Sequence, residues 1–213
     1  MCRNCIASAF DRMVVPHLVH VGCRMDAFSR MRRHIVPKAC GVVVEVGFGS
    51  GHNLGHYDPA RVTGLIGIDP DRTMLALAQS RRRDFTRPVE LIPASAEDMP
   101  LADGSADTVV VTYALCTIPD AGKALAEIRR ILKPGGRLLF AEHARADAAF
   151  TRRWQDRLDR IWGQLAGGCY LTRDPQRLLT DAGFATRDIV HTRFTGLLWH
   201  LGDHVAGVAM PAR

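Results

Sequence analysis

The stretch Val42-Val-Val-Glu-Val-Gly-Phe-Gly-Ser-Gly-His-Asn-Leu54 decides the fold. Its apolar residues predict a buried strand over 42–46, which a single carboxylate, Glu45, interrupts. Three glycines follow at every second position of Gly47–Gly51. A strand that opens into a glycine loop and then into a helix is typical of a site that holds a cofactor against the backbone.

The spacing of the glycines separates two kinds of cofactor. The loop reads G-x-G-x-G, with an acid two residues before the first glycine. The dinucleotide fingerprint G-x-G-x-x-G would need a glycine at position 52, where this chain has His52. The missing glycine and the acid at Glu45 therefore disfavour a nicotinamide dinucleotide. A nicotinamide-dependent oxidoreductase on a similar sheet remains the alternative from another functional class.

The composition predicts one globular domain over residues 1–213. The chain has 213 residues, of which 47% are hydrophobic, enough for a sizeable core. Its formal net charge is +6, and arginines gather at 30–33, 81–87 and 152–160. We interpret these clusters as solvated helix faces, with attraction to anionic ligands or weak contact with a membrane surface as the alternative. Few aromatic residues interleave with them, so we expect no nucleic-acid partner. The sequence predicts no particular oligomeric state.

Targeting signals and cysteine spacing predict the compartment. No apolar run approaches the ~20 residues that span a bilayer, and the N-terminus lacks the apolar region of a signal peptide. We therefore expect a cytoplasmic protein. The six cysteines show no framework spacing and should be free thiols. The pair Cys2-x-x-Cys5 has no second Cys or His pair at matching spacing, so we expect no metal.

Strands alternate with helices through the middle of the chain, which predicts an α/β fold with a doubly wound, Rossmann-like parallel sheet and helices on both faces. We expect strands over 42–46, 65–68, 89–92, 106–113, 137–141, 185–191 and 204–210. We expect helices within 8–38 (two), from 52–57, and over 72–83, 120–132, 150–166 and 175–182. A tight turn is expected over 133–136.

Polar residues follow the ends of successive strands. Asp69 ends the second strand, where its carboxylate could accept hydrogen bonds from ribose hydroxyls. The turn Ser95-Ala-Glu-Asp98 follows the third strand, and Thr112-Tyr113 ends the fourth. Ligands of open α/β sheets bind outside these carboxyl ends. Asp69 alone could be a helix cap, but the set together indicates a nucleoside cofactor.

Four motifs together resemble those of the class I S-adenosylmethionine-dependent methyltransferases. They are Glu45-Val-Gly-Phe-Gly-Ser-Gly51, Gly67-Ile-Asp69, Ser95-Ala-Glu-Asp-Met-Pro100 and Leu132-Lys-Pro-Gly-Gly-Arg-Leu138. The resemblance covers about residues 41–143. It implies a seven-stranded sheet, mostly parallel, with an antiparallel last strand. It also divides the chain into N-terminal helices that cover the site (1–40), a cofactor-binding core (41–143), and a lid with C-terminal strands (144–213).

The same resemblance assigns roles around S-adenosyl-L-methionine. The glycine loop would face its methionine part, Glu45 would lie near its ammonium, and Asp69 would hold its ribose. Ala96 and Glu97 would border the adenine, and Ser95 stands where many relatives carry Asp. The predicted cofactor-binding residues are Glu45, Gly47, Gly49, Gly51, Asn53, Asp69, Pro70, Met74, Ser95, Ala96, Glu97, Thr112 and Tyr113.

Downstream motifs resemble a narrower group. Thr112-Tyr-Ala-Leu-Cys-Thr-Ile-Pro119, Glu142-His143 and Gly167-Gly-Cys-Tyr-Leu-Thr-Arg-Asp174 are similar to the mammalian microsomal alkyl-thiol methyltransferases and their bacterial relatives. The resemblance implies methyl transfer to an apolar thiol. Some of these relatives are labelled phospholipid or quinone methyltransferases, so a phospholipid amine and a quinol carbon are the alternative acceptors. The mammalian proteins carry an N-terminal membrane anchor, which we do not expect before residue 40 here.

His143 is the predicted catalytic residue, because it lies just beyond the fifth strand at the functional edge of the sheet. It would favour the thiolate form of the acceptor, which is the nucleophilic form. The alternative is a hydrogen-bonded structural histidine. We interpret Cys116 as a small apolar filler rather than a reactive thiol. Residues 150–170, with Trp154 and Trp162, are expected to form a lid over the substrate.

Overall fold

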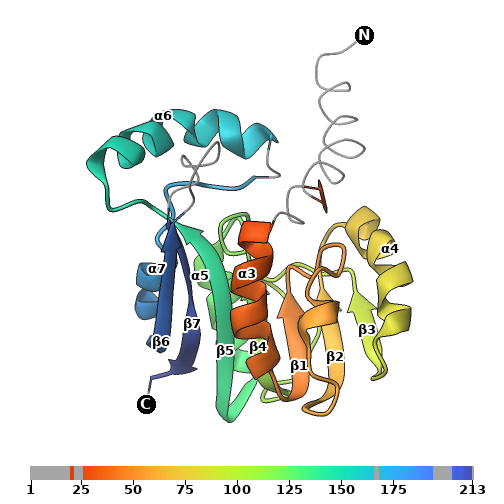
Figure 1. The fold of residues 1–213 in the computed structure, drawn as a ribbon. Coiled ribbons are helices and arrows are strands. Elements are labelled where there is room, and N and C mark those ends of the chain that lie inside the picture. Colours follow the sequence, from red (N-terminus) through yellow and green to blue (C-terminus); the bar gives the residue numbers. More distant parts are fainter. Residues whose placement is uncertain (1–19, 22–25, 166–167, 194–202, 213) are drawn as a thin grey trace.

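The computed structural model describes residues 20–21, 26–165, 168–193 and 203–212. Seven strands form one sheet in the order β3-β2-β1-β4-β5-β7-β6 (Figure 1). All neighbours pair in parallel except β7, which is antiparallel to both β5 and β6. The predicted sheet, with its antiparallel last strand, is confirmed. The strands are β1 Gly41–Val46, β2 Val62–Ile68, β3 Val89–Ile92, β4 Ala106–Thr112, β5 Leu132–Ala144, β6 Phe184–Arg193 and β7 Asp203–Pro211.

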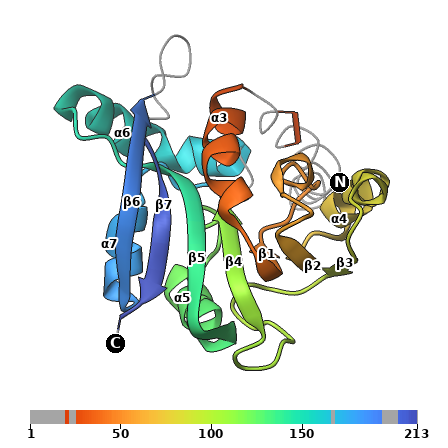
Figure 2. The ribbon, with the colours of Figure 1, turned by 60° about the horizontal axis from the view of Figure 1, so that its bottom comes forward.

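Helices cover both faces of the sheet. Helices α3 and α4 cover one face, and α5 and α7 cover the other (Figures 1 and 2). Side chains of each pair pack in the hydrophobic cluster on their own face. Helix α6 lies across the carboxyl ends of the strands, at the top of Figure 1. The helices are α3 Asp26–Ile35, α4 Arg72–Arg81, α5 Ala121–Ile131, α6 Ala149–Leu165 and α7 Pro175–Asp181. Short 3-10 helices are η1 Val36–Lys38, η2 Leu54–His56 and η3 Arg82–Asp84.

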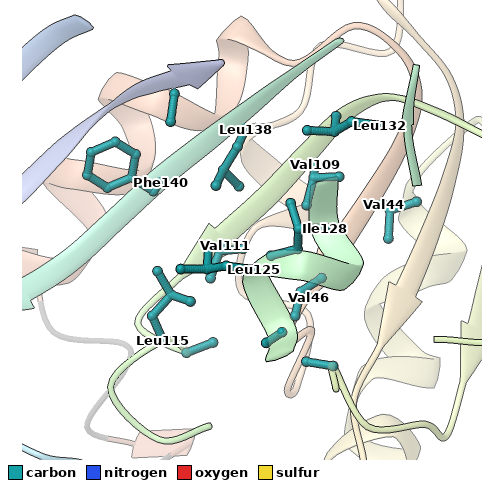
Figure 3. Packing of buried hydrophobic residues seen from close by; sticks show 14 of the residues in the cluster. Val44, Val46, Val109, Val111, Leu115, Leu125, Ile128, Leu132, Leu138 and Phe140 are labelled. Carbon is teal, nitrogen blue, oxygen red and sulfur yellow. The ribbon is translucent and has the colours of Figure 1, made fainter. Parts of the chain in front are cut away.

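The central strands are buried on both faces, which explains their continuous apolar sequences. Val109 and Val111 of β4 face α5, whereas Val110 between them packs in the cluster on the opposite face. Leu125 and Ile128 of α5 fill the space against β4 (Figure 3). Truncating a fully buried side chain such as Ile128 to Ala typically costs about 2–5 kcal/mol of stability. The core therefore fixes the strand ends that carry the site.

Two local expectations differ from the structure. The helix expected from 52–57 is only the short η2, because Gly55 weakens a helix and the residue before Pro59 is disfavoured in α conformation. The turn expected over 133–136 is an excursion inside β5. Ala106 pairs with Leu132, but the next pair joins Thr108 to Arg137, so four residues of β5 lie opposite one residue of β4.

Of the two helices expected within 8–38, the second is α3, and the first falls mostly outside the described residues.

Candidate functional site: the cofactor edge of the sheet

The glycine loop that follows β1 has a backbone that only glycine adopts easily. Gly47, Gly49 and Gly51 have φ values of 72°, 55° and 75°. A Cβ on Gly47 would lie 2.3 Å from the Cβ of Ala114, so packing also requires glycine there. A Cβ on Gly49 would meet the flexible end of Met74 at 3.4 Å and the Gly47 carbonyl at 4.0 Å, both ordinary contacts. Gly47 is thus required by the fold, whereas Gly49 leaves space beside the loop.

Asp69, at the end of β2, holds this loop in place. Its Oδ2 accepts a hydrogen bond from the Gly49 amide at 2.7 Å, and its Oδ1 accepts one from the Asp71 amide at 2.9 Å. Burial raises the pKa of Asp69, which is 9% exposed, and the two amides oppose that rise. Each carboxylate oxygen has a further lone pair, so ribose hydroxyls could still bind. The alternative of a helix cap is wrong, because Asp71 caps α4 through the Thr73 and Met74 amides.

Glu45 is the centre of a buried polar network. Its Oε2 accepts a hydrogen bond from the Tyr57 hydroxyl at 2.6 Å, and its Oε1 accepts one from the Asn53 amide group at 2.9 Å. Asn53 also donates to Oγ1 of Thr112 at 3.0 Å. Burial raises the pKa of Glu45 to about 8 against these hydrogen bonds. The empty protein therefore holds a proton on Glu45 at neutral pH, and a cation beside it would displace that proton.

The structure brings together three predicted residues in this network, namely Glu45, Asn53 and Thr112. Sequence reasoning missed Tyr57. It lies 12 residues from Glu45 and carries no motif, so only the fold reveals the contact.

The turn after β3 is built by its own side chains. Ser95 Oγ donates to Glu97 Oε2 at 3.1 Å and accepts from the Glu97 amide at 3.2 Å. The other carboxylate oxygen of Glu97 accepts from the Asp120 amide, the N-cap of α5, at 2.6 Å. Ala96, between them, is buried. Ser95 thus shapes the turn that would border an adenine. Of the other predicted residues, Pro70 is exposed next to Asp69, and Met74 is half-buried beside Gly49.

Tyr113 follows β4 in a strained conformation. Its φ of 56° lies in the left-handed region, where residues other than glycine are uncommon and often functional. A hydrogen bond of 2.9 Å joins its hydroxyl to Nδ1 of His204. Phe28 meets the ring edge-on, and the guanidinium of Arg32 lies 5.2 Å from the ring centroid. His204 was not anticipated, although its place in the last strand, opposite His143, puts it at the same edge.

His143 contacts a cysteine. Its Nε2 and Sγ of Cys169 are 2.8 Å apart, and both residues are buried. Burial lowers the pKa of His143, but the hydrogen bond to Cys169 and the charges of Cys169, Glu142 and Asp159 together outweigh burial, and the net shift is upward. Cys169 has its pKa lowered to about 5, first by a hydrogen bond from Cys116 and then, against its burial, by the charge of His143. The pair therefore favours a thiolate beside an imidazolium.

Glu142 and Arg173 fix the loop after β4. Glu142 Oε1 accepts from the amides of Ala114 and Leu115 at 2.8 and 3.0 Å, while burial raises the pKa of Glu142 to about 7. Arg173 donates to the carbonyls of Leu115 and Ile118. Both side chains thus hold the backbone of residues 114–118 in place.

The described part of the N-terminal segment reaches the glycine loop. A hydrogen bond of 2.7 Å joins Nδ1 of His20 to Oγ of Ser50, and His52 Nε2 lies 3.1 Å from the His20 carbonyl. On the other side of the site, Leu158 and Trp162 of α6 pack with Phe28 against Leu171. The division into a covering segment, core and lid stays a prediction, with these contacts in its favour.

Comparisons with known proteins agree with this geometry. The family model described as a methyltransferase domain matches residues 44–140. The human thiol S-methyltransferase TMT1A is 34% identical over 88% of this chain and 78% of its own length. The chain belongs to the class I S-adenosylmethionine-dependent methyltransferases.

One further relative and one solved structure are similar to this methyltransferase. The ubiquinone/menaquinone biosynthesis C-methyltransferase UbiE of Rubrivivax gelatinosus is 29% identical over 92% of this chain and 79% of the relative. The crystal structure of a SAM-dependent methyltransferase from Methanosarcina mazei superimposes with a TM-score of 0.63 at 20% identity, covering 80% of this chain and 92% of that one. The predicted enzyme class, a methyltransferase, is confirmed, and the alternative of a nicotinamide-dependent oxidoreductase does not agree with these comparisons. The roles of individual site residues stay predictions.

Proposed function

We propose that this methyltransferase transfers a methyl group from S-adenosyl-L-methionine to a small apolar thiol. One observation carries the choice of acceptor. The methyltransferase-domain match ends at residue 140, but the human thiol S-methyltransferase is 34% identical over 88% of the chain, a higher identity than the 29% of the quinone methyltransferase. The similarity therefore extends past the cofactor-binding core into the segments that lie over the carboxyl ends of the strands, where an acceptor would bind.

The cofactor site follows from the contacts around the glycine loop. Asp69 would accept from the ribose hydroxyls while it holds Gly49, and Glu45 would lie near the ammonium group. Ala96 and Glu97 would border the adenine. Bound there, S-adenosylmethionine supplies an electrophilic methyl group on a sulfonium. The chain then has to align the acceptor with that methyl group and exclude water.

A thiol acceptor asks little more of the protein than an environment that favours the thiolate. His143 remains our candidate for this task. Because its Nε2 is engaged by Cys169, His143 would act on an acceptor through the group that it forms with that thiol.

A quinol carbon is the second candidate acceptor, since the UbiE relative also spans most of the chain. A phospholipid amine is the third. A methyl-transfer assay with a panel of alkyl thiols, aryl thiols, quinols and phosphatidylethanolamine vesicles separates them, with S-adenosylhomocysteine and the methylated product both quantified. We expect turnover with thiols. Turnover with quinols or lipid and none with any thiol would overturn the thiol proposal and leave the enzyme class intact.

We also infer a cytoplasmic enzyme that makes at most weak contact with membranes and none with nucleic acid. No helix among the described residues is long and apolar enough to cross a bilayer. Helix α6 exposes Phe150 and Ile161 and carries Arg152, Arg153 and Arg157. Such a helix suits a weak contact with anionic lipid. Sedimentation with anionic vesicles but not with zwitterionic ones would support this contact, and no sedimentation with either would contradict it.

A further inference from the structure

Two thiols and one imidazole meet in the interior beside the cofactor edge. They belong to Cys116, in the loop after β4, His143, near the end of β5, and Cys169, ahead of α7. Sγ of each cysteine and a ring nitrogen of the histidine all lie within 4.8 Å of one another. All three residues are buried. The hydrogen bonds described above for the glycine loop, Asp69 and Glu45 involve other residues, so the proposed cofactor site leaves this group unexplained.

We propose that Cys116, His143 and Cys169 bind a soft divalent cation, with zinc as the representative ion. The donors are the sulfur and imidazole ligands that zinc prefers. Magnesium and calcium prefer oxygen ligands, and none of these three residues supplies one. Zn–S bonds of about 2.3 Å and Zn–N bonds of about 2.0 Å place ligand atoms about 3.6 Å apart in a tetrahedral site. The present spacing is compatible with that value, since Nε2 of His143 and Sγ of Cys169 are 2.8 Å apart and no two of the ligand atoms are more than 4.8 Å apart.

The segments that carry the ligands are held together by other contacts. The Tyr170 amide donates to the Cys116 carbonyl at 3.0 Å, which ties the two cysteine-bearing segments. Glu142 binds the amides of Ala114 and Leu115, just ahead of Cys116. A site whose ligands are already positioned loses little conformational freedom when the ion binds.

Three protein ligands leave one coordination position open, which is the arrangement of catalytic rather than structural zinc sites. Within the part of the chain that the structure describes, no fourth Cys, His, Asp or Glu joins the group. The fourth ligand would therefore be water or a small molecule. The inference does not depend on the acceptor being a thiol, because the site is defined by these three residues alone. It departs from the expectation of no metal, which considered only the spacing of cysteines along the chain.

Metal content and cobalt spectroscopy test the site. The full chain is expressed with added zinc and purified under reducing conditions, and its zinc is measured after removal of loosely bound ions. We expect about one zinc per chain. We expect that cobalt, exchanged for zinc, gives the thiolate-to-cobalt charge-transfer band and the intense visible bands of a tetrahedral site.

Matched variants locate the ion. Cys116→Ser and Cys169→Ser should each lose the bound zinc and the charge-transfer band. Cys40→Ser should keep both, because the half-buried Cys40 thiol accepts a hydrogen bond from Arg137 and lies outside the group. A double variant, Cys2→Ser with Cys5→Ser, should also keep both. Thermal unfolding of each variant, with and without S-adenosylhomocysteine, verifies that the fold survives.

Three results would overturn the proposal. One is a reduced, zinc-supplied wild-type chain without stoichiometric metal. Another is zinc that stays bound in both Cys116→Ser and Cys169→Ser, or that is lost in the double variant of Cys2 and Cys5. The third is a Cys116–Cys169 disulfide, seen by mass spectrometry after alkylation, in protein kept reduced throughout.

Discussion

Replacing Asp69 with asparagine changes a single atom at the centre of the cofactor site. The carboxylate accepts from two backbone amides, those of Gly49 and Asp71. In Asp69→Asn one acceptor oxygen becomes an NH₂ group, which would face an N–H donor and lose that hydrogen bond. A hydrogen bond to a charged group contributes about 1.5–3 kcal/mol. Burial already disfavours the charge of Asp69, so we expect a loss near the lower end of that range.

A loss of about 1.5–2 kcal/mol lowers the melting temperature of a domain of this size by about 3–8 °C. Cofactor binding should weaken further, because the charge-assisted hydrogen bonds to the ribose are lost as well. We expect at least a tenfold rise in Kd, which corresponds to about 1.4 kcal/mol. Asp69→Ala removes both amide contacts and should exceed both effects.

Thermal unfolding and titration calorimetry with S-adenosylhomocysteine measure the two quantities. The matched control is Asp71→Asn, two residues away, because asparagine caps a helix about as well as aspartate. That control should keep its melting temperature and its affinity. A change in Kd below twofold in Asp69→Asn would refute the placement of the ribose at this carboxylate.

Four further outcomes are expected. Gly49→Val should fold with a lowered melting temperature, because valine is strained at a φ of 55°, and should lose cofactor binding in calorimetry, because its side chain enters the open space beside the loop. Gly47→Ala should also lower the melting temperature, since its Cβ would collide with that of Ala114. The affinity for cofactor should rise with pH up to about 8, because the ammonium of the cofactor favours ionised Glu45. The empty protein should lose stability between about pH 4.5 and 8, because over that range folded Glu45 keeps a proton that the unfolded chain has released. Calorimetry in buffers of different ionisation enthalpy should show proton release on binding at pH 7, and its persistence in Glu45→Gln would contradict this role. His143→Ala should lower turnover with thiols at nearly unchanged cofactor affinity, and a parallel loss of affinity would indicate a purely structural residue.

Features encoded by neighbouring residues were predictable from the sequence. Residues 89–92 were expected as a strand and form β3, and the glycine loop, the Asp174 cap and the Pro175 helix start also follow from local chemistry. Contacts between distant residues were not predictable in this way. Tyr113 and His204 are 91 positions apart, and His143 and Cys169 are 26 apart. No periodicity or spacing along one chain reports such pairs, because the order of the strands in the sheet creates them.

The Arg173 side chain has a consequence for redesigning the acceptor. It donates hydrogen bonds to the carbonyls of Leu115 and Ile118, and these bonds hold the chain between β5 and α7 against the loop after β4. Grafting residues 145–174 from a relative would break this attachment unless residues 114–119 travelled with them. The two segments form one exchangeable unit, although helix α5 and strand β5 separate them in the sequence. Chimaeras that exchange both segments should fold, whereas those that exchange residues 145–174 alone should lose the contacts that hold the loop after β4.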